Sequence, residues 1–117
     1  MSLNFKLVKV GRNVAPWVKE LKGKSGVYLI REKDGVLFFA GAVVYVGESH
    51  TNRLYSTLLR HFQHWTGKTA GPTFAVSKVE VAIVRCPAKR ALDLQNSTIE
   101  EYRPRLNTIA NPDAEKE

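Results

Sequence analysis

Two apolar runs joined by a tight return constrain this chain more than any other feature. The first run opens with Gly-Val-Tyr at 26–28, and the second closes with Tyr-Val-Gly at 45–47. β-Branched and aromatic residues, which favour strands, fill both runs. Between them, Asp34-Gly35 is a pair typical of a hairpin turn. Segment 26–47 therefore predicts antiparallel strands joined by a tight return.

The hydrophobic period changes from that of a strand to that of a helix directly after these motifs. Apolar and aromatic side chains then recur on one helical face: Leu54, Leu58, His61, Phe62 and Trp65. Polar and basic side chains occupy the adjacent face: Arg53, Thr57, Arg60 and His64. We expect this helix to begin near Arg53, with Thr51 or Asn52 as its N-cap.

A further strand and a second helix complete the pattern. Alternating valine and isoleucine residues within 76–84 predict a strand. Pro87 suits the first turn of the helix that follows, and Pro104 ends it. Four residues share one face of that helix: Leu92, Gln95, Ile99 and Tyr102. This order of elements is typical of an α+β fold in which helices pack against a small sheet.

The length of 117 residues suits one domain with one core. We expect an N-terminal extension over 1–24 that packs on a domain over 25–108, followed by a polar tail over 109–117. Within the extension, 5–10 alternates as a strand does. Segment 16–21 fits a short helical turn with its tryptophan and its last leucine facing inward.

Charge and cysteine content limit the classes of function. The net charge of +7 favours a polyanionic partner, with nucleic acid ahead of an anionic membrane. The single cysteine, Cys86, excludes an internal disulfide and a cysteine-rich zinc site. The apolar stretches are too short to cross a bilayer, and the start of the chain lacks the apolar centre of a signal peptide. We therefore expect a cytoplasmic protein without a membrane partner.

Side chains around the two tyrosine motifs are candidates for chemistry. Tyr28 and Tyr45 stand in strands, where aromatic residues also fill cores. Gly47 allows the backbone to turn sharply after Tyr45. The next helix start, with Arg53 beside it, then comes near both rings and offers a phosphate site. His61 lies between the basic and apolar faces, and fits either a catalytic role or a satisfied, partly buried histidine.

These residues resemble the GIY-YIG endonuclease family. The tripeptides at 26–28 and 45–47 match its two motifs, and Asn52-Arg53-Leu54 looks like its arginine at a helix start. Segment 99–107 is similar to the end of the nuclease domain in the bacterial excision-repair incision subunit. The resemblance covers about 25–108. It implies a three-stranded antiparallel sheet flanked by helices, and hydrolysis of DNA phosphodiester bonds with one divalent ion, Mg²⁺ or Mn²⁺.

In the chemistry that the resemblance implies, tyrosine helps to activate water and arginine stabilises charge on the phosphate. A glutamate on a helix holds the ion, and its position falls on Gln95, four residues before Ile99. A neutral amide oxygen is a weak ligand for a hard cation. Asp93 and Glu100 lie on other faces of the helix. We therefore predict a DNA endonuclease domain whose cleavage is impaired.

The predicted site divides into three groups. The catalytic residues are Tyr28, Tyr45, Arg53 and His61. The substrate-binding residues are Gly47, Arg60, His64 and Asn107, and Gln95 takes the metal position. Arg53 and Arg60 both remain candidates for the catalytic arginine, and Arg53 is preferred because its surroundings resemble the repair nuclease more closely. The alternatives are a non-catalytic DNA-binding module on the same fold, and an assembly protein that is basic only for solubility.

Overall fold

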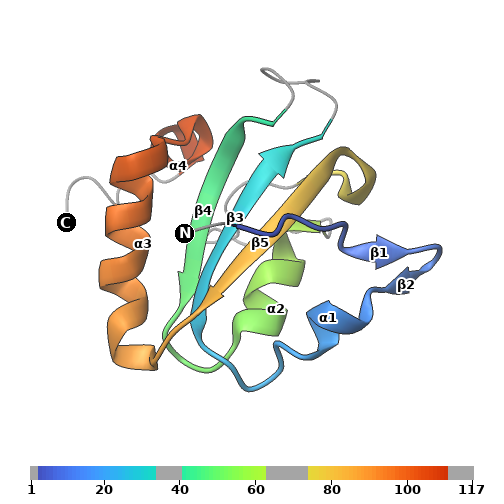
Figure 1. The fold of residues 1–117 in the computed structure, drawn as a ribbon, viewed down its shortest axis with the longest axis horizontal. Coiled ribbons are helices and arrows are strands. Elements are labelled where there is room, and N and C mark those ends of the chain that lie inside the picture. The colour runs from blue at the N-terminus through green and yellow to red at the C-terminus, as the bar shows by residue number, and fades with distance from the viewer. Residues whose placement is uncertain (1–2, 34–40, 63–73, 111–117) are drawn as a thin grey trace.

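The computed structural model describes residues 3–33, 41–62 and 74–110 (Figure 1). Its helices and strands follow in this order: β1 (Lys9–Val10), β2 (Asn13–Val14), α1 (Pro16–Lys19), β3 (Gly26–Glu32), β4 (Val43–Ser49), α2 (Leu54–Leu59), β5 (Val79–Arg85), α3 (Ala88–Tyr102) and α4 (Arg105–Ala110). Two 3₁₀ turns, Arg60–Phe62 and Val76–Lys78, follow α2 and precede β5. The fold is α+β, as the sequence predicts.

β3 is the central strand of a three-stranded antiparallel sheet with the order β4-β3-β5. Tyr28 on β3 lies opposite Gly47 on β4 and Ile83 on β5. The first residue of β3 has to be a glycine, because a Cβ on Gly26 would lie 2.5 Å from the carbonyl oxygen of Val84. The predicted three-stranded antiparallel sheet is therefore confirmed, with one close backbone approach that sequence periodicity does not reveal.

Different helices cover the two faces of this sheet (Figure 1). Successive side chains of a strand point to opposite faces, and β3 divides accordingly. The tyrosine face packs against α1 and α2, and its buried side chains include Tyr28, Ile30, Tyr45, Val81, Val18, Leu21, Leu54 and Leu58. The α3 face buries Val27, Leu29 and Val46 against α3, through Leu94 and Ile99.

The N-terminal segment packs along the outer edge of β5. Lys6 and Val81 exchange two backbone hydrogen bonds, of 3.0 and 2.8 Å. The strand predicted over 5–10 is shorter than expected, since only Lys9–Val10 forms β1. In the helical turn that follows, Trp17 is half-buried and Leu21 is buried against the tyrosine face, as predicted.

The apolar face predicted for the helix after the second tyrosine motif is confirmed over its described residues, although the helix is shorter than predicted. α2 ends at Leu59 and continues as the 3₁₀ turn. Leu54 and Leu58 are fully buried, and His61 is 3% exposed. The change of helix type therefore keeps the inward direction of the side chains that the helical spacing predicts.

The predicted face of the second helix is wrong by part of a turn. Leu92 is 50% exposed, and Tyr102 is 38% exposed. Ile99 packs on the sheet, as predicted, but its neighbours there are Leu94 and the buried Ala91. α3 ends before Pro104, as predicted, and the separate helix α4 follows it.

Some predictions fall on parts of the chain that the structure does not describe. These are the hairpin turn at Asp34-Gly35, the side chains of His64 and Trp65, the loop over 67–72 and the last seven residues of the tail. Among the described helices, no span is long and apolar enough to cross a membrane.

Candidate active site

A hydrogen bond joins a tyrosine of the first motif to a histidine 33 residues further along the chain. The Oη atom of Tyr28 lies 2.7 Å from Nε2 of His61. The central strand supplies the tyrosine, and the 3₁₀ turn after α2 supplies the histidine. Both side chains are buried, at 2% and 3% exposure. The structure thus unites two of the predicted catalytic residues in one polar pair.

Two more rings surround this pair. The ring centroid of Tyr45 lies 4.9 Å from that of His61 and 6.3 Å from that of Tyr28. Phe74 packs on the histidine from 6.1 Å. We call these four residues, Tyr28, Tyr45, His61 and Phe74, the aromatic cluster. Tilted ring packing of this kind orients the imidazole as well as filling space.

Gly47 makes room for the cluster. A Cβ at this position would lie 2.3 Å from both Cζ and Oη of Tyr28. The Tyr28 ring therefore lies directly over the backbone of the neighbouring strand, which any larger residue would prevent. The structure gives the glycine of the second motif a positioning role, and its predicted contact with substrate stays a prediction.

Burial favours the protonated form of the Tyr28 phenol, and neighbouring groups modify this effect on its pKa. Burial raises the pKa of Tyr28 well above its ordinary value of 10.0, and Tyr45 and Glu48 raise it further, whereas Arg60 lowers it. Arg60 is half-buried and acts on the site tyrosine, while Arg53 is exposed at the start of α2. Arg60 therefore acts electrostatically on Tyr28, and the choice between Arg53 and Arg60 as the catalytic arginine stays a prediction.

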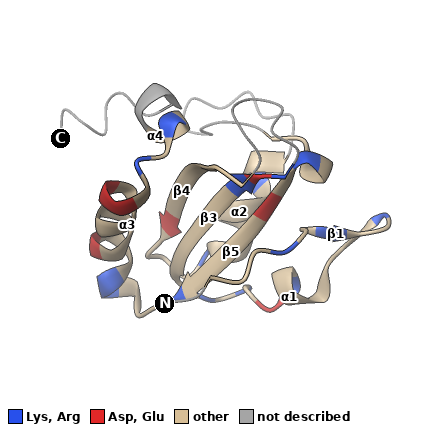
Figure 2. Cartoon of the chain, turned by 45° about the horizontal axis from the view of Figure 1, so that its top comes forward, with Lys and Arg blue, Asp and Glu red and all other residues tan. Residues whose placement is uncertain are grey.

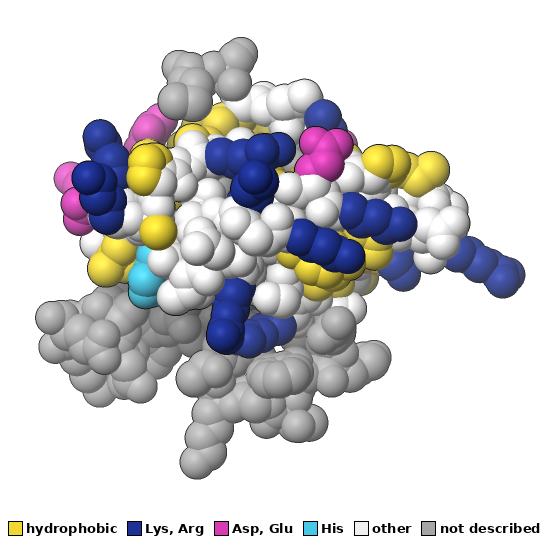
Figure 3. Space-filling model, turned by 90° about the horizontal axis from the view of Figure 1, so that it is seen from below, with side chains coloured by type: hydrophobic (Ala, Val, Ile, Leu, Met, Phe, Trp, Pro, Cys, Tyr) yellow, Lys and Arg dark blue, Asp and Glu magenta, His cyan; other side chains and the backbone are white. Residues whose placement is uncertain are grey.

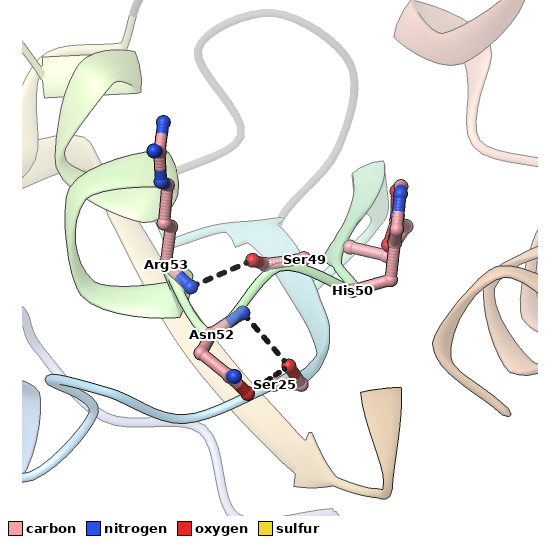
Figure 4. Close-up of polar contacts among 6 residues, drawn as sticks. Ser25, Ser49, His50, Asn52 and Arg53 are labelled. Atoms are coloured by element: carbon pink, nitrogen blue, oxygen red, sulfur yellow. Dashed lines mark hydrogen bonds and ion pairs between the residues drawn. The ribbon is translucent and has the colours of Figure 1, made fainter. Parts of the chain in front are cut away.

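The start of α2 is built differently from the prediction. Arg53 is the N-cap residue, and no side chain caps the helix. The N–H of Arg53 donates to Oγ of Ser49 at 3.0 Å, and that of Asn52 donates to Oγ of Ser25 at 3.0 Å (Figure 4). The N–H of Leu54 donates to the carbonyl oxygen of Lys24. These three N–H groups are already bonded and are not free for a phosphate, and the predicted phosphate site at this helix start stays a prediction.

Gln95 lies on a helix that covers the other face of the sheet. It is half-buried on α3, which packs on the α3 face, whereas Tyr28, Tyr45 and His61 lie on the tyrosine face. Within the described residues, no group of three or more His, Cys, Asp or Glu side chains is placed to hold a metal ion. The described residues therefore offer no set of donors that fits a divalent metal ion, and the neutral amide of Gln95 is itself a weak ligand for such an ion.

Asn107 ties the end of the domain to the edge of the sheet. Its Oδ1 accepts a hydrogen bond from the N–H of Val46 at 2.8 Å, and its Nδ2 donates to the carbonyl oxygen of Val46 at 2.7 Å. One amide side chain thus replaces a neighbouring strand at the edge of β4. This gives Asn107 a structural role, and its predicted contact with substrate stays a prediction.

Sequence reasoning missed one acidic residue that acts electrostatically on Tyr28. Glu48 directly follows the second motif, raises the pKa of Tyr28 and lies 3.0 Å from Nδ1 of His50. Its side chain is 14% exposed, against 56% for the histidine. An acid beside a tyrosine–glycine motif is the signal that identifies it, because a half-buried carboxylate at a strand end acts on neighbouring titratable groups.

Comparisons of this chain with protein-family models, with curated proteins and with solved structures found no match.

Proposed function

We propose that this chain is a DNA-binding domain of GIY-YIG nuclease type, with phosphodiester hydrolysis as its chemistry and little or no cleavage while Gln95 is present. The observation that carries the proposal is the 2.7 Å contact between Oη of Tyr28 and Nε2 of His61, with the ring of Tyr45 beside it. Residues of both tyrosine motifs and of the following helix meet at one place. Chemistry, and not packing alone, gives a reason for a polar pair there.

The paired groups can move one proton in the proposed reaction. As the oxygen of a water molecule attacks phosphorus, the water gives a proton to the oxygen of Tyr28, whose own proton passes to Nε2 of His61. The bond from phosphorus to the leaving oxygen breaks, and that oxygen takes a proton from solvent. The cation of Arg60 stabilises the negative charge that develops on the phosphate.

The metal requirement belongs to the family that the chain resembles. A divalent ion, Mg²⁺ or Mn²⁺, would polarise the phosphate and the attacking water. The donors described above do not fit such an ion, and this supports weak or absent cleavage by the chain as it stands. Replacement of Gln95 by glutamate adds an anionic group of nearly the same shape, on the α3 face and not on the face of Tyr28 and His61.

A second candidate function is DNA binding without catalysis. The burial of Tyr28 and His61 favours it, because a catalytic phenol has to reach the water or phosphate on which it acts. The net charge of +7 supports both candidates equally. An assembly protein that is basic only for solubility would bind DNA without preference for any face.

Binding and cutting separate these candidates in one set of measurements. DNA affinity measured at several salt concentrations should fall steeply with salt. Arg60→Ala should weaken binding more than Arg12→Ala, a matched change in the turn between β1 and β2. Equal effects, or no salt-dependent binding, would contradict the proposal. A plasmid-nicking assay on the chain and on its Gln95→Glu variant, with Mn²⁺ and with chelator, then distinguishes a nuclease from a binding module.

A further inference from the structure

A groove of about 570 Å³ opens where β5 ends and α3 begins. Its volume lies within the roughly 300–1,000 Å³ of pockets that bind small molecules or cofactors. Apolar and charged residues both line it, among them Val84, Arg85, Cys86, Arg90 and Leu94. The groove lies apart from the aromatic cluster, because Val84 and Leu94 belong to the α3 face.

The two arginines of the groove are available to an anion. Arg85 has an ion pair with Glu20, but the separation is 3.8 Å and the two side chains are 52% and 67% exposed. A long pair between exposed groups contributes little. Arg90 is exposed on the first turn of α3 and acts electrostatically on the Cys86 thiol. Against these cations, Asp93 is the one carboxylate among the described residues that line the groove, and Glu48 also acts electrostatically on Cys86.

The surroundings of the groove are basic. Figure 3, which views the molecule from below, shows lysine and arginine side chains spread over this end. Lys22 and Lys24 precede β3, and Lys89 lies in the first turn of α3 beside Arg90; all are exposed. Figure 2 shows the same end of α3 as basic, with acidic residues further along the helix. A polyanion is therefore attracted to this end of the sheet.

The apolar walls indicate what kind of anion fits. A bare phosphate would leave Val84, Pro87 and Leu94 exposed to water, whereas a nucleotide can place its base against them. A base inside a duplex is stacked and paired, so it reaches such a groove only when it is unpaired. Cationic grooves with surfaces for bases are the usual device for holding single strands.

We propose that this groove binds an unpaired nucleotide of the DNA, with its phosphate between Arg85 and Arg90 and its base against Val84 and Leu94. The inference rests on the proposed DNA binding and deepens it. It selects DNA that carries a single-stranded part, such as a gap, a flap or an overhang, over a continuous duplex.

The single cysteine of the chain is a built-in probe of the groove. Cys86 lines the groove and is half-buried, so an uncharged maleimide reports its access. Labelling is timed at fixed pH with and without a single-stranded oligonucleotide at about ten times its dissociation constant. Occupancy of the groove should then slow labelling about tenfold. A duplex of the same sequence should slow it far less.

Arginine variants test the phosphate contact. Arg85→Ala and Arg90→Ala should each weaken single-strand binding about tenfold, as the loss of one charge-assisted hydrogen bond does. Arg12→Ala, the matched control, should change it little. The ratio of labelling rates with and without DNA is compared within each protein. Burial raises the pKa of the Cys86 thiol, Arg90 lowers it and Glu48 raises it, and the ratio cancels these effects within each protein.

The outcomes separate this inference from the proposed function. DNA binding can depend on salt while Cys86 stays unprotected, or while the arginine variants bind as Arg12→Ala does. Either result would overturn nucleotide binding in the groove and leave the proposed DNA binding intact. Equal protection by duplex and single strand overturns the unpaired nucleotide. If the chain binds no DNA at all, the proposed function and this inference are both wrong.

Discussion

The tyrosine face and the α3 face share the same three strands, but their cores differ in chemistry. The core of the α3 face joins Val27, Leu29 and Val46 to Leu94 and Ile99. The core of the tyrosine face contains, beside its aliphatic residues, a phenol bonded to an imidazole. A buried hydrogen bond adds only about 1 kcal/mol to stability, and a lost partner costs more. The comparison singles out the buried polar pair of the tyrosine face as the feature that packing alone does not explain.

The largest expected effect on stability tests how closely the ring of Tyr28 packs on Gly47. Gly47→Ala would place its Cβ 2.3 Å from Oη of Tyr28, which is held by His61. We expect a loss of roughly 3 kcal/mol in the free energy of unfolding, as for severe overpacking. Chemical denaturation measures it.

The matched control for this change is Gly41→Ala, where a Cβ has open space and only the φ of +84° is unfavourable. It should cost about 1 kcal/mol. In a Tyr28→Ala background, Gly47→Ala should cost far less than alone. If the cost stays the same with and without the tyrosine ring, the proposed fit is wrong.

The next largest effect on stability is expected at the edge strand β4, where Asn107 bonds the backbone. Asn107→Ala removes both hydrogen bonds to the backbone of Val46 and leaves a buried donor and acceptor without these partners. We expect a loss of about 2 kcal/mol in unfolding free energy. Asn96→Ala, an exposed change on α3, is the control and should be close to neutral. Similar values for the two variants would contradict the structural role of Asn107.

A smaller effect isolates the polar pair of the tyrosine face. Tyr28→Phe removes one hydroxyl and should cost about 1 kcal/mol at neutral pH. Tyr102→Phe, at an exposed tyrosine, is the control.

Tyr28→Phe also tests how the free energy of unfolding depends on pH. The folded protein raises the pKa of Tyr28 above the ordinary 10.0, so this contribution to stability is complete below pH 10 and is lost as pH rises further. The loss is at most about 1.4 kcal/mol per pH unit between the unfolded and folded pKa values. Denaturation curves above pH 10 should therefore fall less steeply for Tyr28→Phe. Parallel pH profiles for the two proteins would show that burial does not shift this phenol.

The smallest effect on stability is expected on the α3 face. Gln95→Glu changes a half-buried amide to a carboxylate of similar shape, and should alter unfolding free energy by less than about 0.5 kcal/mol without metal. Thermal denaturation with chelator measures it. A large destabilisation would show that Gln95 is a structural part of the α3 face, and that cleavage by the variant cannot be read as a change in metal binding alone.

Periodicity was enough to predict the strands and the inward side of α2, because burial follows spacing along the chain. It placed the start of the helix near the rings of Tyr28 and Tyr45 and left the role of His61 open, and the structure brings His61 to both rings. It did not predict that Gly47 supports the Tyr28 ring, or that Asn107 bonds Val46, because both contacts depend on which residues lie opposite each other in three dimensions.

The errors have similar causes. Leu92 and Tyr102 were assigned to the buried side of α3 because they are apolar, but α3 is turned so that Ala91 and Leu94 meet the sheet. The preference for Arg53 as the catalytic arginine, which comes from its place in the sequence, stays a prediction. The charge that acts on Tyr28 comes from Arg60, at the other end of α2, where the chain approaches the aromatic cluster.

The most direct test of the central claim is plasmid nicking by Gln95→Glu and by the double variant Gln95→Glu, Tyr28→Phe, each with Mn²⁺ and with chelator. The account predicts metal-dependent nicking by the first protein. It predicts a rate lower by about 10²-fold or more for the second, since a positioned proton-transfer group contributes that much. Equal nicking by the two proteins would remove Tyr28 from the chemistry. No nicking by a folded, DNA-binding Gln95→Glu protein would contradict a latent nuclease and leave a binding module.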